Sequence, residues 1–304
     1  MPSFDYTSVP PMSFKSGYVS IFGKPNAGKS TLLNALMGEK MAIVSHKVQT
    51  TRHRIKGFLN DKNYQIIISD TPGIIDPKYK LHEKMMKHVK NSMEDADAAV
   101  FLYDLASDSL EEADLIFSPL RLKAPCVVVL NKTDLVSSEK KEAAIAFFKE
   151  KKYAKAVLPI SVVKKQGVDQ LIPLLLPFMP EGEPFFPQDD LSDMPTKFFV
   201  SELIREKIYE FYHEEIPYHT TVLIQEFKEK TTLIKIQADI IVHRDTQKFI
   251  VIGEGGSMIK KLGTESRKTI EAFLGQKVFL ELFVKVKPKW RDDELRLREF
   301  GYNS

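Results

Sequence analysis

The sequence predicts an α/β domain with a mostly parallel sheet and helices on both faces, followed by a smaller α+β domain. In the first half of the chain, short strand-like apolar runs alternate with helical ones, which is typical of parallel strands joined by helices. After a proline-rich connector, the order becomes helix, strand, strand, helix, helix, strand. We assign 1–15 to an N-terminal extension, 16–177 to the first domain, 178–195 to the connector, 196–290 to the second domain and 291–304 to a tail.

The elements of the first domain follow from local signals. Gly38 is placed to end the first helix, and the turn residues 60–63 connect two strands as a hairpin. Ligands of such sheets bind at the carboxyl ends of the strands, so polar residues that follow a strand are candidates for a site. Strands are predicted over Tyr18–Phe22, Ile55–Leu59, Tyr64–Ser69, Ala98–Tyr103, Pro125–Leu130 and Ala156–Ile160, and helices over Thr31–Met37, Leu81–Met93, Glu111–Leu122, Lys140–Lys149 and Val168–Leu176.

The connector and the second domain have a different pattern. Prolines at positions 177, 180, 184, 187 and 195 exclude a continuous helix and predict an extended chain. A glycine-rich loop over 253–256 then separates two helices of the second domain. Helices are predicted there over Phe198–His213, Thr246–Ile252 and Met258–Phe273, and strands over Thr221–Phe227, Leu233–Val242 and Val278–Val286.

Composition limits the class of protein. The chain is 43% hydrophobic and 28% charged, as in ordinary globular proteins, and its formal net charge of +3 provides no global basic field. The single cysteine, Cys126, excludes a disulfide within the chain and is typical of a reducing cytoplasm. No stretch resembles a signal peptide or reaches the roughly 18 apolar residues that span a bilayer. We expect a cytoplasmic protein, peripheral on the inner face of the cell membrane only if a partner or a surface-binding face holds it there.

Residues 23–30, Gly-Lys-Pro-Asn-Ala-Gly-Lys-Ser, match G-x-x-x-x-G-K-[ST] between a predicted strand and a predicted helix. Glycines let successive backbone N–H groups converge on one point, and the helix N-terminus adds the positive end of its dipole. Lys29 is predicted to neutralise the β- and γ-phosphates and Ser30 to ligate Mg²⁺. The alternative is a simple glycine turn. The residues expected at the nucleotide here are Gly23, Lys24, Pro25, Asn26, Ala27, Gly28, Lys29, Ser30 and Thr31.

Three further segments, each after a strand, complete a nucleotide site. Asp70 is predicted to hold Mg²⁺ through water, and the Gly73 N–H to sense the γ-phosphate. The Asp134 carboxylate can accept the N1–H and N2–H₂ of guanine, whereas adenine lacks these donors and would leave a charge unpaired. The combination predicts GTP rather than ATP. The remaining residues assigned to GTP are Thr71, Pro72, Ile74, Asn131, Lys132, Thr133, Ser161 and Val162.

The polar segment 39–52 lies where a GTP-dependent switch loop is expected. Within it, the Thr51 hydroxyl is predicted to close the Mg²⁺ shell, with Thr50 as the second choice; the alternative is a solvated loop. Ile74 follows the Asp-x-x-Gly segment, where Ras-like enzymes carry a glutamine that orients water. Catalysis then depends on positioning and charge neutralisation by Lys29, Mg²⁺, Thr51 and the Gly73 N–H, and we expect slow turnover.

The four nucleotide segments, the Gln-Thr-Thr-Arg-His-Arg run at 49–54 and the tail Trp-Arg-Asp-Asp-Glu-Leu-Arg at 290–296 together resemble the Era family over nearly the whole chain. These are bacterial GTPases with a C-terminal KH domain that act in small ribosomal subunit assembly. The resemblance implies a P-loop GTPase domain, a type II KH domain, and single-stranded ribosomal RNA, at the 3′ end of 16S RNA in the small ribosomal subunit, as partner. We expect a monomer.

Asn26 suggests a second cation. In related GTPases that lack the glutamine, an asparagine at this position of the phosphate-binding loop helps to seat K⁺. We hypothesise the same role for Asn26, because a potassium ion would supply the positive charge that an arginine finger supplies elsewhere. The alternative is that Asn26 only forms the turn, since asparagine is a favoured turn residue.

The loop Gly253-Glu254-Gly255-Gly256 lies in the context of a KH G-x-x-G loop, which grips about four single-stranded nucleotides. The absence of a β-carbon at its outer glycines allows close approach to the sugar-phosphate chain. Glu254 repels phosphate. Two other readings stay open: a GTP-controlled scaffold whose second domain binds protein, and an ATP-dependent kinase or ATPase, which residues 131–134 disfavour. The basic residues predicted to contact phosphate are Lys260, Lys261 and Arg267.

Overall fold

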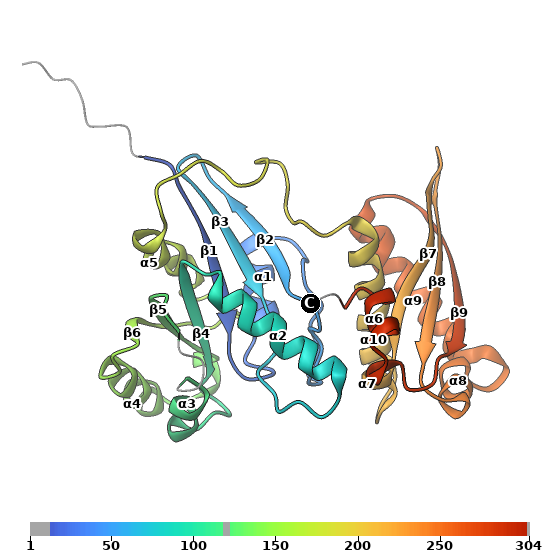
Figure 1. The fold of residues 1–304 in the computed structure, drawn as a ribbon, viewed down its shortest axis with the longest axis horizontal. Coiled ribbons are helices and arrows are strands. Elements are labelled where there is room, and N and C mark those ends of the chain that lie inside the picture. The colour runs from blue at the N-terminus through green and yellow to red at the C-terminus, as the bar shows by residue number, and fades with distance from the viewer. Residues whose placement is uncertain (1–12, 118–121, 303–304) are drawn as a thin grey trace, which may run out of the picture.

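The computed structural model describes residues 13–117 and 122–302, which form two domains lying side by side (Figure 1). The first domain has a six-stranded sheet of order β2-β3-β1-β4-β5-β6. Only β2 is antiparallel to its neighbour, so the mostly parallel sheet is confirmed. Its strands are β1 (Lys15–Phe22), β2 (Ile55–Asn60), β3 (Tyr64–Asp70), β4 (Ala98–Asp104), β5 (Cys126–Asn131) and β6 (Ala154–Pro159).

Helices cover both faces of this sheet. Apolar side chains of α1 and α5 pack on one face, and those of α2, α3 and α4 pack on the other. The last part of the helix predicted over 111–122, residues 118–121, lies outside the described residues. The bounds are α1 (Lys29–Met37), α2 (Lys80–Glu94), α3 (Leu110–Phe117), α4 (Ser138–Lys149) and α5 (Leu171–Leu175).

The second domain has a three-stranded sheet of order β7-β8-β9, in which β7 is antiparallel and β9 parallel to β8. Leu262, Ser266 and Ile270 are buried four residues apart along α9, which is the spacing of one helix face. That face packs with α6 and β8 in one core. The bounds are α6 (Thr196–Phe211), α7 (Ile216–His219), β7 (Thr221–Glu229), β8 (Ile234–Val242), α8 (Asp245–Ile252), α9 (Ser257–Leu274), β9 (Val278–Val286) and α10 (Glu294–Glu299).

The connector follows a fixed path along the edge of the first sheet. The Phe186 ring stacks on Phe58 of β2, with centroids 4.0 Å apart. The Gln65 Oε1 of β3 accepts hydrogen bonds from the backbone N–H groups of Phe185 and Phe186, at 2.7 and 3.0 Å. The extended chain is therefore part of the first domain's packing.

The C-terminal tail fills the junction between the domains. Trp290 and Tyr302 are almost fully buried, in a cluster with Leu81 and Met85 of α2 and Ile241 of β8. The Trp290 indole N–H donates to the carbonyl of His219 at 3.0 Å. The tail thus joins a helix that follows the Asp70 segment to the second domain.

Candidate nucleotide-binding site

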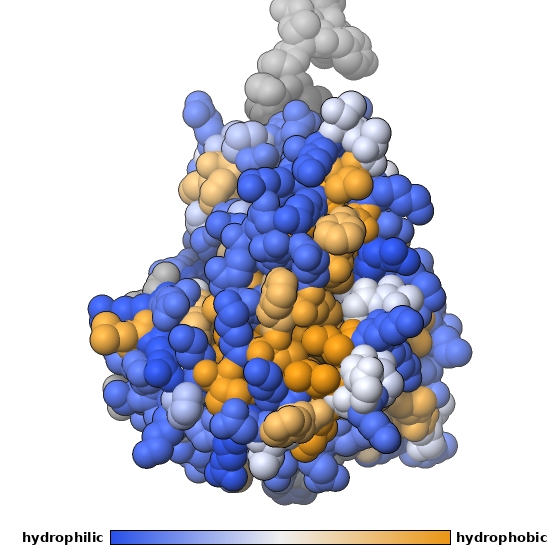
Figure 2. All heavy atoms as spheres, turned by 90° about the vertical axis from the view of Figure 1, so that its right-hand side faces the viewer, coloured by the Kyte–Doolittle hydropathy of each residue, from blue (hydrophilic) through white to orange (hydrophobic). Residues whose placement is uncertain are grey.

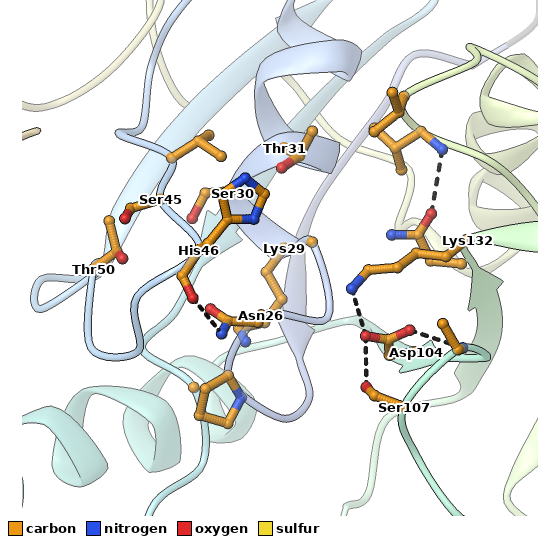
Figure 3. A pocket seen from close by; sticks show the side chains of 18 of the residues that line it. Asn26, Lys29, Ser30, Thr31, Ser45, His46, Thr50, Asp104, Ser107 and Lys132 are labelled. Carbon is orange, nitrogen blue, oxygen red and sulfur yellow. Dashed lines mark hydrogen bonds and ion pairs between the residues drawn. The ribbon is translucent and has the colours of Figure 1, made fainter. Parts of the chain in front are cut away.

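The predicted nucleotide segments meet around one cavity of about 730 Å³ at the carboxyl ends of the strands (Figure 3). Most of the predicted residues lie on its walls. The predicted residues that line it are Pro25, Asn26, Gly28, Lys29, Ser30, Thr31, Thr50, Thr51, Gly73, Asn131, Lys132, Asp134, Ser161 and Val162.

Several of the other predicted residues make hydrogen bonds next to the residues that line the cavity. The Thr71 hydroxyl donates to the carbonyl of Ile21 at 2.9 Å, and the Thr133 N–H donates to the carbonyl of Ile160 at 3.2 Å. The Ile74 N–H donates to the carbonyl of Gly23 at 3.2 Å, while the Ile74 side chain packs on the apolar core. Those that the cavity lining does not include are Gly23, Lys24, Ala27, Asp70, Thr71, Pro72, Ile74 and Thr133.

The phosphate-binding loop needs glycine at Gly28. Its φ is +100°, and a β-carbon there would lie 2.5 Å from the Asn131 amide nitrogen. The Lys29 ammonium folds back over the loop and donates to the carbonyls of Gly23 and Lys24, at 3.2 and 2.7 Å. Burial lowers the pKa of Lys29 to about 8, and the nearby Asp70 and Asp108 oppose this shift. A phosphate in the cavity would favour the charged ammonium.

Three predicted metal ligands gather at one point. The Ser30 Oγ lies 2.8 Å from the Thr51 Oγ1 and 2.7 Å from the Asp70 Oδ2. Burial raises the pKa of Asp70 to about 6, against the hydrogen bonds from Ser30 and Thr51 and the charge of Lys29. Among the described residues, the buried Asp70 Oδ1 has no hydrogen-bond partner. A carboxylate and two hydroxyls form an oxygen donor set that suits Mg²⁺.

The second choice for the metal, Thr50, is engaged elsewhere. Its hydroxyl donates to the carbonyl of Lys47 at 2.6 Å. The geometry therefore favours Thr51 for this role.

The base end of the cavity is held together by Asn131. Its amide nitrogen donates to the carbonyl of Ala27 at 2.8 Å, and its Oδ1 accepts from the Val162 N–H at 3.2 Å. The Asp134 carboxylate accepts from the Ser161 hydroxyl at 2.5 Å and faces the cavity. The phosphate and base loops are thus fixed relative to each other.

Sequence reasoning missed several lining residues. Leu135 and Val163 stand 65% and 77% exposed at the base end, where apolar walls suit the faces of a purine ring. Asp104 ends β4, so the rule that sites lie at strand ends was a signal that pointed to it. The lining residues that were not assigned individually are Ile43, Val44, Ser45, His46 and Gln49 of the predicted switch segment, and Asp104, Ala106, Ser107, Leu135 and Val163.

The predicted switch segment is bound to the second domain. Arg52, next to Thr51, is 1% exposed and donates to the carbonyls of Thr220 and Pro217, at 2.8 and 2.9 Å. On the other side of Thr51, the carbonyl of Thr50 accepts from the Arg205 guanidinium on α6. The Thr51 hydroxyl is therefore flanked by two anchors to α6 and α7.

Further contacts extend along α6. The Val44 N–H donates to the Glu206 carboxylate at 3.1 Å. The Lys47 ammonium donates to the carbonyls of Tyr209 and Tyr212 at the C-terminus of the helix, where a cation is favourable. The switch segment therefore contacts α6 at several points between Val44 and Thr50.

The glycine loop of the second domain adopts the conformation expected for glycine, with φ of +74° at Gly253, +58° at Gly255 and +78° at Gly256. Farther along the chain, Lys260 and Arg267 of α9 line an open groove of about 350 Å³. The apolar residues of the groove are Ile259, Leu280 and Leu282.

Figure 2 shows apolar side chains gathered on the outer side of this domain, surrounded by hydrophilic ones.

Lys261 points away from this groove. Its ammonium lies 4.5 Å from the centroid of the Phe211 ring of α6, on another side of α9, and the groove lining does not include it. The structure therefore brings together only two of the three basic residues predicted to contact RNA. Glu254 is exposed in the loop.

Comparison with known proteins agrees with both domains. Residues 18–132 match a family of 50S ribosome-binding GTPases, and residues 215–291 match the KH domain. The GTPase Era of Geobacter sp. (strain M21) is 45% identical over 95% of this chain and 98% of its own length. The chain belongs to the Era family of GTPases. The predicted family and fold class are thereby confirmed.

Other Era proteins are similar over their full length. GTPase Era of Geotalea uraniireducens (strain Rf4) is 42% identical over 95% of this chain and 98% of its own. Two solved Era structures, each 38% identical, align with a TM-score of 0.90 over 96% of this chain and 100% of theirs. One is Era in complex with MgGDPNP and nucleotides 1506–1542 of 16S ribosomal RNA, and the other is a variant of Aquifex aeolicus Era bound to GDP and AlF₄⁻.

Proposed function

We propose that this chain binds GTP with Mg²⁺, hydrolyses it slowly, and binds the 3′ end of 16S ribosomal RNA through its KH domain during assembly of the small ribosomal subunit. The observation that carries this proposal is the convergence of the Ser30, Thr51 and Asp70 oxygens, of which Ser30 and Thr51 line the same cavity as Lys29 and Asp134. The Era relative crystallised with MgGDPNP and 16S nucleotides supports both ligands.

In this proposal, the chain's own residues position the phosphates and neutralise their charge. Lys29 donates to the β- and γ-phosphates, and the Gly73 N–H contacts the γ-phosphate. Ser30 and Thr51 would ligate Mg²⁺ and Asp70 would hold it through water; when bound, the ion would neutralise charge that develops on the phosphates. The partly buried Ile74 side chain packs against the core and offers no group to orient water, so turnover is slow without further help.

The test of this function measures GTP turnover and RNA binding in the same protein. We expect slow release of phosphate from GTP and none from ATP, together with salt-sensitive binding of a short single-stranded RNA of the 16S 3′ end. GTP turnover without RNA binding would instead favour the scaffold whose second domain binds protein.

Asn26 supports a role for K⁺ in hydrolysis. Its amide nitrogen donates to the carbonyl of His46 at 2.8 Å, which joins the phosphate-binding loop to the switch segment. The Asn26 side-chain oxygen and the carbonyls of the switch segment are oxygen donors of the kind that bind alkali cations at the edge of the phosphates.

We therefore expect GTP hydrolysis to be about tenfold faster in KCl than in NaCl, as measured by single-turnover phosphate release. The Asn26→Ala variant should lose this difference, and choline chloride at the same ionic strength controls for screening. Equal rates of the wild-type protein in the two salts would leave Asn26 as a turn residue.

The groove on α9 gives a test of RNA binding. We expect Lys260→Ala to weaken binding of the RNA and to reduce the slope of log affinity against log salt by about 1, because one phosphate contact is lost. Lys268→Ala is the matched control, since Lys268 lies on the same helix, pairs with Glu265 and is not part of the groove lining. Equal effects of the two variants would contradict the proposed groove.

We further propose that residues 16–177 and 196–290 are the two functional units and that the protein acts in the cytoplasm as a monomer, with any contact to the inner face of the cell membrane being peripheral. Within 13–117 and 122–302, no helix has the length and apolar character needed to cross a bilayer. Light scattering of the purified chain and sedimentation with lipid vesicles test the last two points.

A further inference from the structure

Lys132 of the base-binding loop is held by an acidic residue from another strand. The Asp104 Oδ2 at the end of β4 lies 2.5 Å from the Lys132 ammonium, and both residues line the cavity (Figure 3). The Asp104 side chain is only 4% exposed. A buried carboxylate is stabilised in its charged form by a partner of opposite charge, so this ion pair is a fixed part of the site.

The orientation of Asp104 is itself fixed by the turn that follows β4. Its Oδ2 accepts from the Ser107 hydroxyl at 2.7 Å, and its Oδ1 accepts from the Ala106 N–H at 2.9 Å. The Asp104 N–H donates to the Asp108 carboxylate at 3.0 Å. The turn therefore orients the carboxylate through hydrogen bonds that do not involve Lys132.

Lys132 combines an uncommon backbone conformation with a flexible side chain. Its backbone has φ of +66°, a left-handed conformation that non-glycine residues adopt uncommonly. Its side chain has four rotatable bonds, and freezing them on ligand binding has an entropy cost. With the ammonium held at one end and the backbone at the other, the methylene chain is held at the cavity wall.

We propose that Asp104 is a positioning residue for the guanine nucleotide, which acts by holding the methylene chain of Lys132 in place as one wall of the base site. The role rests on the proposed binding of guanine nucleotides and names a residue of that site outside the four motifs. If Asp104 only stabilised its own turn, its effect on nucleotide release would not depend on Lys132.

A double-mutant cycle in the full-length chain separates the two roles. The probe is GDP that carries a fluorescent N-methylanthraniloyl group on its ribose, and the readout is its release rate. We expect Asp104→Asn to speed release about tenfold in the wild-type background and less than twofold in the Lys132→Met background. Ser107→Ala, which removes a hydrogen bond but keeps the ion pair, is expected to change release by less than threefold.

Equal acceleration in both backgrounds, or no acceleration by Asp104→Asn alone, would overturn this role. If Asp104→Asn does not fold, Asp104→Glu provides the second measurement: its charge can still pair with Lys132, so its release rate should depend on Lys132, and independence from Lys132 would refute the role. Failure of the wild-type protein to bind the probe would overturn the proposed function together with this role. Tight binding with independent effects overturns this role only.

Discussion

Asp134→Asn is expected to lower the affinity for GTP by at least a hundredfold and to raise the affinity for xanthosine triphosphate. The carboxylate of Asp134 faces the cavity and can accept both the N1–H and the N2–H₂ of guanine. Losing these charge-assisted hydrogen bonds while the base is desolvated costs about 3 kcal/mol or more. Xanthine carries a carbonyl at C2, to which the asparagine amide can donate.

Displacement of labelled GDP by GTP, xanthosine triphosphate and ATP measures this change. Ser161→Ala is the matched control, because it removes the hydroxyl at 2.5 Å from Asp134 but keeps the carboxylate; its loss of affinity should be much smaller. A variant that still prefers GTP over xanthosine triphosphate would show that Asp134 does not select the base. Equal uptake of ATP and GTP by the wild-type protein would refute the nucleotide assignment.

Arg52→Met is expected to uncouple the two domains. Arg52 donates to the carbonyls of Pro217, Tyr218 and Thr220, at 2.8 to 3.1 Å, and methionine would leave these groups without their donor. Loss of several hydrogen bonds to one buried charge weakens the contact by about 3 kcal/mol or more. Arg52 follows Thr51 in the chain. Without the Arg52 contacts, a change in Thr51 on nucleotide binding would no longer be transmitted to α7.

Coupling of this kind is reciprocal, so it can be measured from the RNA side. In the wild-type protein we expect the affinity for a short single-stranded RNA to differ between the GTP and GDP forms by about five- to a hundredfold. The Arg52→Met variant should bind the RNA almost equally in the two forms. Arg54→Met is the control, since Arg54 contacts Ser69 and Asp95 within the first domain. A ratio that Arg52→Met leaves unchanged would remove Arg52 from the coupling.

The predicted site residues that the structure brings together are those that a strand end fixes. Ser30 and Asp134 follow buried parallel strands and Asp70 ends one, and the carboxyl ends of parallel strands lie at one edge of a sheet. The loop and helix geometry then brings Ser30 and Asp134 to one cavity, with Asp70 directly behind Ser30. The motif spacing was sufficient for this part of the site.

Contacts between segments far apart in the sequence could not be predicted. Nothing local in residues 40–52 indicates that they bind α6 and the end of α7, since these pairs are more than 150 residues apart. The sequence also did not predict that the ammonium of Lys24, a residue assigned to the nucleotide, pairs with Asp108 after β4 and with Glu112 of α3. The strand β1 begins at Lys15, earlier than predicted, because pairing with β3 supplies the regularity that its polar first residues lack.

The different directions of the Lys260 and Lys261 side chains could have been predicted from helix geometry. Consecutive residues on an α-helix point about 100° apart, so both ammonium groups cannot face the same narrow groove. Lys260 lies in the groove and Lys261 contacts Phe211. Helical position, in addition to charge, separates the two.

The path of the connector determines where the first domain can be cut. Strand β2 is the edge of its sheet, and an unpaired edge is a template for aggregation. The connector covers it: the Phe58 N–H donates to the carbonyl of Leu191 at 2.9 Å, and the Ser192 hydroxyl donates to the carbonyl of Lys56 at 2.6 Å. A recombinant first domain that ends at residue 177 would expose this edge and the Phe58 ring. One that extends through Asp193 would keep the connector residues that cover both.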